Sequence, residues 1–365
     1  MATRHPGPAP LRRPGGRSRA GPPGARALSV TKLLPRRLCA ARRPWPKWCV
    51  VGRRIAVGLG LLLLGGLAVA FWLDLADTEA VGRALSTGAP WIPLLFLLEG
   101  LRIAAEVSVT RRLAGGGVRR LGRGRLWSAH LAAYAVGTVA PGGRLAAETV
   151  KAASIAPAVG GAQAARVGIV GHVLALLSVG LVSVPCAMVA LVWTGPSLLT
   201  VALALHALVL CGIAALLLGG LRSGAVERLT RGIPRLGAWL ARVGDAARQR
   251  RIPPAAAALL LGARLVEALE YGVLFVAVGH RFGLDSIFLG NGVDLIASAV
   301  GNWLPGQLGA TETAFAAAAP TLGVALPLAV SVVLLRRVVQ GLWVAAGALA
   351  PLLTKLLLPP PTPRA

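Results

Sequence analysis

Long apolar stretches alternate along this chain with short charged connections. The uncharged stretches reach about 20 residues, which is the length that an α-helix needs to cross the hydrocarbon core of a bilayer. Two further apolar sections, residues 127–159 and 286–322, are each interrupted by a Pro-Gly pair. We therefore expect an all-α, polytopic membrane protein with two broken, re-entrant helical segments in a weak internal repeat. The complete spans, six or seven in number, are predicted near residues 55–73, 90–109, 167–193, 198–221, 255–279 and 322–353.

The composition narrows the class further. Of the 365 residues, 55% are hydrophobic and only 14% are charged. A soluble domain usually has about 25% charged residues and a disordered chain has far fewer apolar ones, so both classes are excluded. The chain carries 39 Lys and Arg against 13 Asp and Glu, a net charge of +26. These basic residues gather in a tail and in short loops, which the positive-inside rule explains, and we expect no nucleic-acid partner.

The sign of the charge differs between successive connections. Asp74, Asp77 and Glu79 follow the first predicted span, whereas residues 111–125 contain six arginines and no acid. Residues 222–254 form a second basic connection. The order basic, acidic, basic predicts a cytoplasmic N-terminus. We expect a multi-pass protein of the cell membrane, the inner or cytoplasmic membrane.

The chain ends differ in composition from the middle. Residues 1–45 are rich in Pro, Gly and Arg and contain no acid, so we predict a basic disordered tail. Three interpretations fit this tail: it is solvated, its start site is placed too far upstream, or it is attracted to an anionic lipid surface. Such attraction contributes about 1 kcal/mol per basic residue, and it would act on the basic loops as well. Residues 46–353 form the predicted membrane domain, and residues 354–365 a short C-terminal tail.

The cysteines and histidines give no sign of a metal site. Neither type shows the close spacing of zinc ligands, and we expect no metal and no cofactor. The cysteines are Cys39, Cys49, Cys186 and Cys211, and the histidines beyond the tail are His130, His172, His206 and His280.

The two Pro-Gly pairs carry the functional prediction. Proline ends a helix because it lacks an amide hydrogen and clashes with the preceding turn, and glycine lets the chain turn sharply. The next helix then presents open amides and a partial positive charge that suit a phosphate or carboxylate. Broken helices in both halves of a membrane protein point to a transporter site at their junction. The two sequences are Pro141-Gly142-Gly143-Arg144-Leu-Ala-Ala-Glu148 and Pro305-Gly306-Gln-Leu-Gly309-Ala-Thr-Glu312.

Glu148 and Glu312 each lie seven residues after the proline of their pair. One interpretation is that they complement the helix dipole, a contribution of about 0.3–1 kcal/mol. The other is that they line a polar cavity, since charges inside spans are costly and usually mark a pathway or a pair. Arg144 and Lys151 flank the first motif and are candidate phosphate contacts.

Other charges lie inside predicted spans. Arg336 and Arg337 are adjacent and point in different directions, so we expect one of them to face the interior and to bind a carboxylate or phosphate, with snorkelling to the interface as the alternative. Two groups share one helix face each through spacings of three or four. The first group is Glu99, Arg102 and Glu106, and the second is Arg264, Glu267 and Glu270. Each group is either a cluster that neutralises its own charge or part of a pathway for a substrate.

These residues resemble the lysylphosphatidylglycerol synthase transmembrane region, also called the flippase-like domain family. The second motif matches the family pattern Pro-Gly-x-Leu-Gly with Glu three residues later, and the mid-span arginine precedes Val-Val-Gln-Gly-Leu-Trp343. In the first motif Arg144 and Ala146 depart from the pattern. The resemblance covers roughly residues 50–353 and implies a domain that binds or translocates lipid.

In the bifunctional members a soluble domain attaches lysine from aminoacyl-tRNA to phosphatidylglycerol. Because this chain ends about 12 residues after its last predicted span, we expect no such enzyme activity. The leading hypothesis is a flippase for a polar-headed phospholipid or lipid-linked precursor, with the headgroup among Arg144, Glu148, Glu312 and Arg336 or Arg337. The alternatives are an accessory subunit that anchors a partner lipid-modifying enzyme, and a membrane-embedded lipid transferase.

Overall fold

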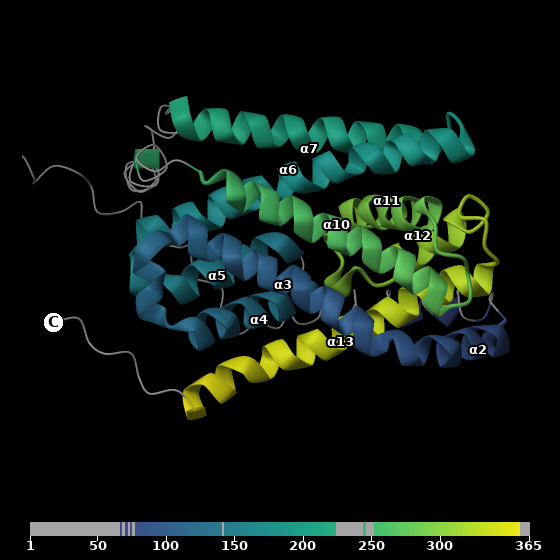
Figure 1. Cartoon of the computed structure of the whole chain (residues 1–365), viewed down its shortest axis with the longest axis horizontal. Coiled ribbons are helices and arrows are strands. Elements are labelled where there is room, and N and C mark those ends of the chain that lie inside the picture. Colours follow the sequence, from purple (N-terminus) through teal and green to yellow (C-terminus); the bar gives the residue numbers. More distant parts are fainter. Residues whose placement is uncertain are drawn as a thin grey trace, which may run out of the picture. The chain divides into compact units, whose positions relative to one another are not determined.

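The computed structural model describes residues 77–140, 142–223 and 252–357, together with positions 66–67, 70–71, 74 and 244–245. Within these residues the regular structure is helical and contains no strand, which confirms the all-α class (Figure 1). Short 3-10 turns occupy η1 (Ala89–Trp91), η2 (Gly115–Leu121) and η3 (Pro305–Gln307). The α-helices are α2 (Thr78–Gly88), α3 (Ile92–Ala114), α4 (Arg123–Val139), α5 (Gly143–Val159), α6 (Gly161–Thr194), α7 (Leu198–Ser223), α10 (Pro254–Ala277), α11 (Leu284–Gly301), α12 (Ala310–Ala318) and α13 (Leu326–Leu357).

Four of the described helices, α6, α7, α11 and α13, are long and apolar enough to cross a membrane. Helices α3 and α10 contain 23 and 24 residues, so each reaches about 35 Å at about 1.5 Å per residue. Both carry intramembrane charges that the sequence pattern singles out, three in each helix, which is more than the apolar membrane-length stretches of the four helices above contain. The chain is therefore a polytopic, multi-pass membrane protein.

Most helix limits lie close to the predicted ones, with two differences. Helix α13 continues to Leu357, because the residues after 353 are good helix formers. The acidic connection contains helix α2, which begins where the Asp77 carboxylate accepts hydrogen bonds from the amides of Glu79 and Ala80. The tail of residues 1–45, nearly all of the first predicted span, most of the basic connection 222–254, and Pro141 lie outside the described residues.

Both broken segments are confirmed. Helix α4 ends at Val139 and α5 begins at Gly143. Helix α11 ends at Gly301, and α12 begins at Ala310 after the turn η3. The helices are therefore interrupted at the two places where the Pro-Gly pairs stand.

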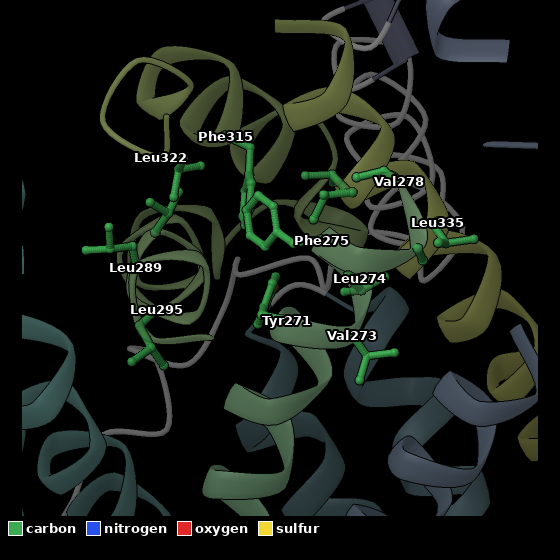
Figure 2. Close-up of a cluster of buried hydrophobic side chains, with 14 of the residues drawn as sticks. Tyr271, Val273, Leu274, Phe275, Val278, Leu289, Leu295, Phe315, Leu322 and Leu335 are labelled. Atoms are coloured by element: carbon green, nitrogen blue, oxygen red, sulfur yellow. The ribbon is translucent and has the colours of Figure 1, made fainter. Parts of the chain in front are cut away.

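The main hydrophobic core lies where α10 passes between the C-terminal helices. Tyr271, Leu274 and Phe275 of α10 are buried there against α11, α12 and α13 (Figure 2). Tyr271 stacks on Phe315 of α12 with ring centroids 5.7 Å apart. This packing fixes α10 and α13, two of the helices that carry the charges of the second half.

Helices α6 and α7 form an antiparallel pair along one edge of the bundle (Figure 1). They approach closely at Gly180, where a Cβ atom would lie 2.7 Å from the sulfur of Cys211. The outer side of α7 exposes large apolar side chains such as Leu205 and Leu208. Such an apolar exterior suits the hydrocarbon of a bilayer.

Candidate functional site

The two helix breaks touch each other. The backbone amide of Gly142 donates a hydrogen bond of 3.0 Å to the backbone carbonyl of Asn302. Gly142 has φ 74° and ψ 12°, and Gly306 has φ 64° and ψ 5°. This left-handed conformation favours glycine because it has no Cβ. The matched glycines of the two motifs thus make the same turn and bring the two halves of the chain together.

A cavity of about 610 Å³ adjoins this junction. Gly143 and Arg144 of the first break line it, as do Asn302, Gly306 and Gln307 of the second. Ligand cavities in proteins usually measure about 300–1,000 Å³, so the space suits a small molecule or the head of a lipid.

The cavity has one charged side and one apolar side. Helices α3, α5, α10, α11 and α13 contribute charged groups, while α6 and α7 contribute five aliphatic side chains and the imidazoles of His172 and His206. The charged lining residues are Arg102, Glu106, Arg144, Lys151, Arg264, Glu267, Asp294, Arg336 and Arg337. The apolar lining residues from α6 and α7 are Ala175, Leu176, Val179, Val209 and Leu210.

Glu106 of α3 is the centre of the first ion-pair group. It accepts a hydrogen bond of 2.8 Å from Arg144 and lies 3.4 Å from Arg102 and 3.7 Å from Lys151. Arg102 also pairs with Glu99 at 2.5 Å, and Lys151 with Glu148 at 2.6 Å. This group fastens α3 to the start of α5.

Arg336 of α13 is the centre of the second group. It lies 2.9 Å from Glu267 of α10 and 2.7 Å from Asp294 of α11. Glu267 also pairs with Arg264, and the Arg336 guanidinium stands 4.6 Å from the ring centre of Tyr271. Asp294 lies near the middle of α11, so this group is far from either end of a membrane-length helix.

Arg337 supports the second break directly. It lies 3.0 Å from Glu312 and donates hydrogen bonds to the backbone carbonyls of Gly306 at 2.6 Å and Gln307 at 3.1 Å. The other carboxylate oxygen of Glu312 accepts a hydrogen bond of 2.8 Å from the amide of Gly309. Glu312 is therefore the cap of α12 and is only 1% exposed.

The structure brings most of the predicted site residues together, with differences. Both Arg336 and Arg337 face interior groups, whereas only one was expected to do so, because Asp294 and Glu267 lie on one side of α13 and the second break on the other. Glu148 and Glu312 are buried behind the cavity wall and are not among its lining residues, which include the cations that they pair with.

Five further predicted residues also lie outside the lining of the cavity. Glu99 is paired with Arg102, and Glu270 is buried on α10. Pro305 and Gly309 shape the second break, as Gly142 shapes the first.

Sequence reasoning missed several lining residues. Asp294 is the clearest case, since it is the one acid within the apolar stretch 286–300 and could have been found by that isolation. His130, His172, Asn302 and Gln307 become site residues only because the two halves meet. Within residues 77–140, 142–223 and 252–357 no cluster of three or more His, Cys, Asp or Glu side chains could hold a metal ion.

Comparison with known families agrees with this architecture. The model of the lysylphosphatidylglycerol synthase TM region matches residues 55–347. The chain belongs to this family. The match includes both breaks and every charged residue that lines the cavity, and the family indicates a membrane protein of lipid modification or transport. No curated protein and no solved structure matches the chain.

Proposed function

We propose that this protein binds the polar head of a membrane lipid in the cavity and moves it across the bilayer, as a flippase or scramblase. The observation that carries the proposal is the opposition of a charged wall and an apolar wall in one cavity. A charged headgroup needs the first wall, and its attached hydrocarbon is tolerated only by the second.

The position of the cavity supports transport. It lies at the junction of two broken helices, where turns and ion pairs change the chain direction inside apolar segments. Broken helices of this kind form the substrate sites of many secondary transporters. The proposed cargo is a phospholipid or a lipid-linked precursor, and the proposed role involves no chemical conversion.

The proposal includes an orientation. Arg111, Arg112, Arg119, Arg120 and Arg123 are exposed around η2. By the positive-inside rule they would lie at the cytoplasmic face of the inner membrane, with the N-terminus on the same side. Anionic lipid headgroups would contact this surface.

A vesicle assay tests the proposal. The purified protein is reconstituted with fluorescent lipid analogues, and dithionite quenching reports how fast each analogue changes leaflet. Arg144→Gln should slow the transfer about tenfold or more, because a charge-assisted hydrogen bond contributes about 1.5–3 kcal/mol. Arg281→Gln is the matched control, since Arg281 lies on an exposed connection and pairs with Asp285. Wild-type vesicles that transfer every analogue at the rate of empty vesicles would contradict the proposal.

The exposed arginines around η2 also favour a second candidate, an accessory subunit that docks an acidic partner enzyme. In that case a partner would co-purify with the chain. Reversing the charge of Arg119 and Arg120 would then release the partner, whereas Arg144→Gln would have no effect on the pathway.

A further inference from the structure

Three buried nitrogen atoms without a hydrogen-bond partner converge on one end of the cavity. They are Nε2 of His130 on α4, Nε of Arg144 on α5 and Nδ1 of His172 on α6. His130 is only 3% exposed, and Nε of Arg144 lies 3.3 Å from Glu148 without the geometry of a hydrogen bond. Buried polar atoms are nearly always satisfied in native proteins, so three open ones that line a single cavity leave it able to bind a polar group there.

The same end of the cavity holds cations with donors to spare. The Lys151 ammonium has three N–H groups, and it donates to Glu148 at 2.6 Å while Glu106, at 3.7 Å, is too far for a hydrogen bond. The Arg144 guanidinium has five, one of which binds Glu106. Both side chains can therefore bind an acceptor without losing their present partners.

The start of α5 adds a partial positive charge. Gly143, the first residue of this 17-residue helix, lines the cavity, and no side chain caps the helix, although the amides of Gly143 and Leu145 donate to the backbone carbonyls of Ala140 and Gly142. The amides of a first helical turn point outward along the axis and attract anions.

The opposite end of the cavity differs. Arg336 is held between Glu267 and Asp294, and Arg337 is occupied by Glu312 and two backbone carbonyls. All five N–H groups of Arg337 thus have acceptors within the protein. Arg336 stands between two carboxylates, whose negative charges repel an anion. An incoming anion is therefore favoured at α5 and not at α13.

We propose that His130, Arg144, Lys151 and His172 form a subsite for a phosphate group at the N-terminus of α5. This subsite rests on the proposed function, in which the phosphate belongs to the head of the lipid and the hydrocarbon chain runs along Leu176 and Leu210. A tetrahedral oxyanion offers enough acceptor positions to be reached from α4, α5 and α6 at once. The ligand chemistry is that of a phosphodiester or a free phosphate ion.

Binding measurements on the full chain in detergent test the subsite. Native mass spectrometry measures the affinity of three probes, namely phosphatidylglycerol, an uncharged glucosyl diacylglycerol, and inorganic phosphate. His130→Leu removes a donor and leaves no charge unpaired. It should weaken phosphatidylglycerol and phosphate about tenfold and change glycolipid binding less than twofold. The matched control is His280→Leu, because His280 lies outside the cavity and contacts Phe275.

Each outcome decides a separate question. Equal weakening of both lipids by His130→Leu, or equal effects of His130→Leu and His280→Leu, would overturn the subsite. Glycolipid binding without binding of either phosphate compound would also overturn it and leave the proposed lipid function standing. Binding of inorganic phosphate that His130→Leu weakens, with neither lipid bound, would support the subsite and end the lipid proposal. If His130→Leu does not fold, Arg144→Lys replaces it, since it keeps the charge but removes the open Nε donor, and the same outcomes apply.

Discussion

The two helix breaks start from the same Pro-Gly pair and end differently. In the first half α5 begins directly after Gly142, and no side chain caps it. In the second half α12 begins only at Ala310, where Glu312 caps it, and Arg337 holds the intervening carbonyls. One break is therefore closed by the protein's own side chains, whereas Arg144 and Lys151 beside the other keep side-chain donors free for the cavity.

The two copies of the Pro-Gly motif therefore have different roles in the structure. The second break is a support, because its charges are satisfied internally. The first break is left for a ligand, because its cations share acids and keep donors free. Substitutions in the second break should mainly lower stability, and substitutions in the first should mainly weaken ligand binding. Equal effects in both places would contradict this division.

The largest effect is expected for Arg337→Gln. It leaves Glu312 buried without its guanidinium partner, which typically costs about 3–5 kcal/mol. The free energy of unfolding can be followed by titration with a denaturing detergent. Arg337→Lys keeps the charge and should lose less. An unchanged unfolding midpoint for Arg337→Gln would show that the second break is not fastened in this way.

Gly143→Ala tests the contact between the breaks. The new Cβ would lie 2.9 Å from the carbonyl oxygen of Gly137 and 3.3 Å from Oδ1 of Asn302. Such overpacking usually costs about 1–3 kcal/mol. Gly161→Ala is a matched control, because Gly161 is likewise the first residue of its helix and has open space around it. If Gly143→Ala and Gly161→Ala had the same free energy of unfolding, the close contact between the two breaks would be wrong.

Arg144→Gln should destabilise the fold by only about 1.5 kcal/mol, the lower limit for a hydrogen bond between charged groups. Glu106 keeps Arg102 and Lys151 as partners when Arg144 is lost, so no buried acid is left alone. The same unfolding titration measures this loss. A loss as large as that of Arg337→Gln would remove the distinction between the two breaks.

The smallest effect is expected for Arg83→Gln. Arg83 pairs with Glu79 at 2.5 Å on α2, but the two side chains are 63% and 82% exposed. Exposed pairs of this kind contribute no more than about 0.5 kcal/mol. This variant is the reference for the other unfolding titrations. If it lowered the free energy of unfolding as much as Gly143→Ala does, the predicted order of the variants would be wrong.

Much of the fold could be predicted from the sequence, because apolar length and Pro-Gly interruptions act locally. The spans now seen as α7 and α10 were placed within about two residues, and both breaks were located. Helix α2 was missed, since its 11 residues are held by a cap and by packing on α13 and not by a long apolar run.

The site was harder to predict, because its partners come from distant parts of the chain. The equal spacing of Glu148 and Glu312 after their prolines suggested equal roles. Gly309 delays the start of α12 and makes Glu312 its third residue, whereas Glu148 lies in the second turn of α5 and pairs with Lys151. The spacing of Gly309 and Glu312 is that of the acidic half of a capping box, in which the third residue of the helix accepts from the amide of the N-cap, and this detail could have separated the two acids.

The hydrogen bond from Gly142 to Asn302 joins the halves of the chain through main-chain atoms alone. A scan of the charged side chains would pass over this link, because none of them takes part in it. An ester in place of that amide would cut it while leaving the turn and every charged group in place. Loss of transfer in such a molecule would reveal how far each half depends on its neighbour.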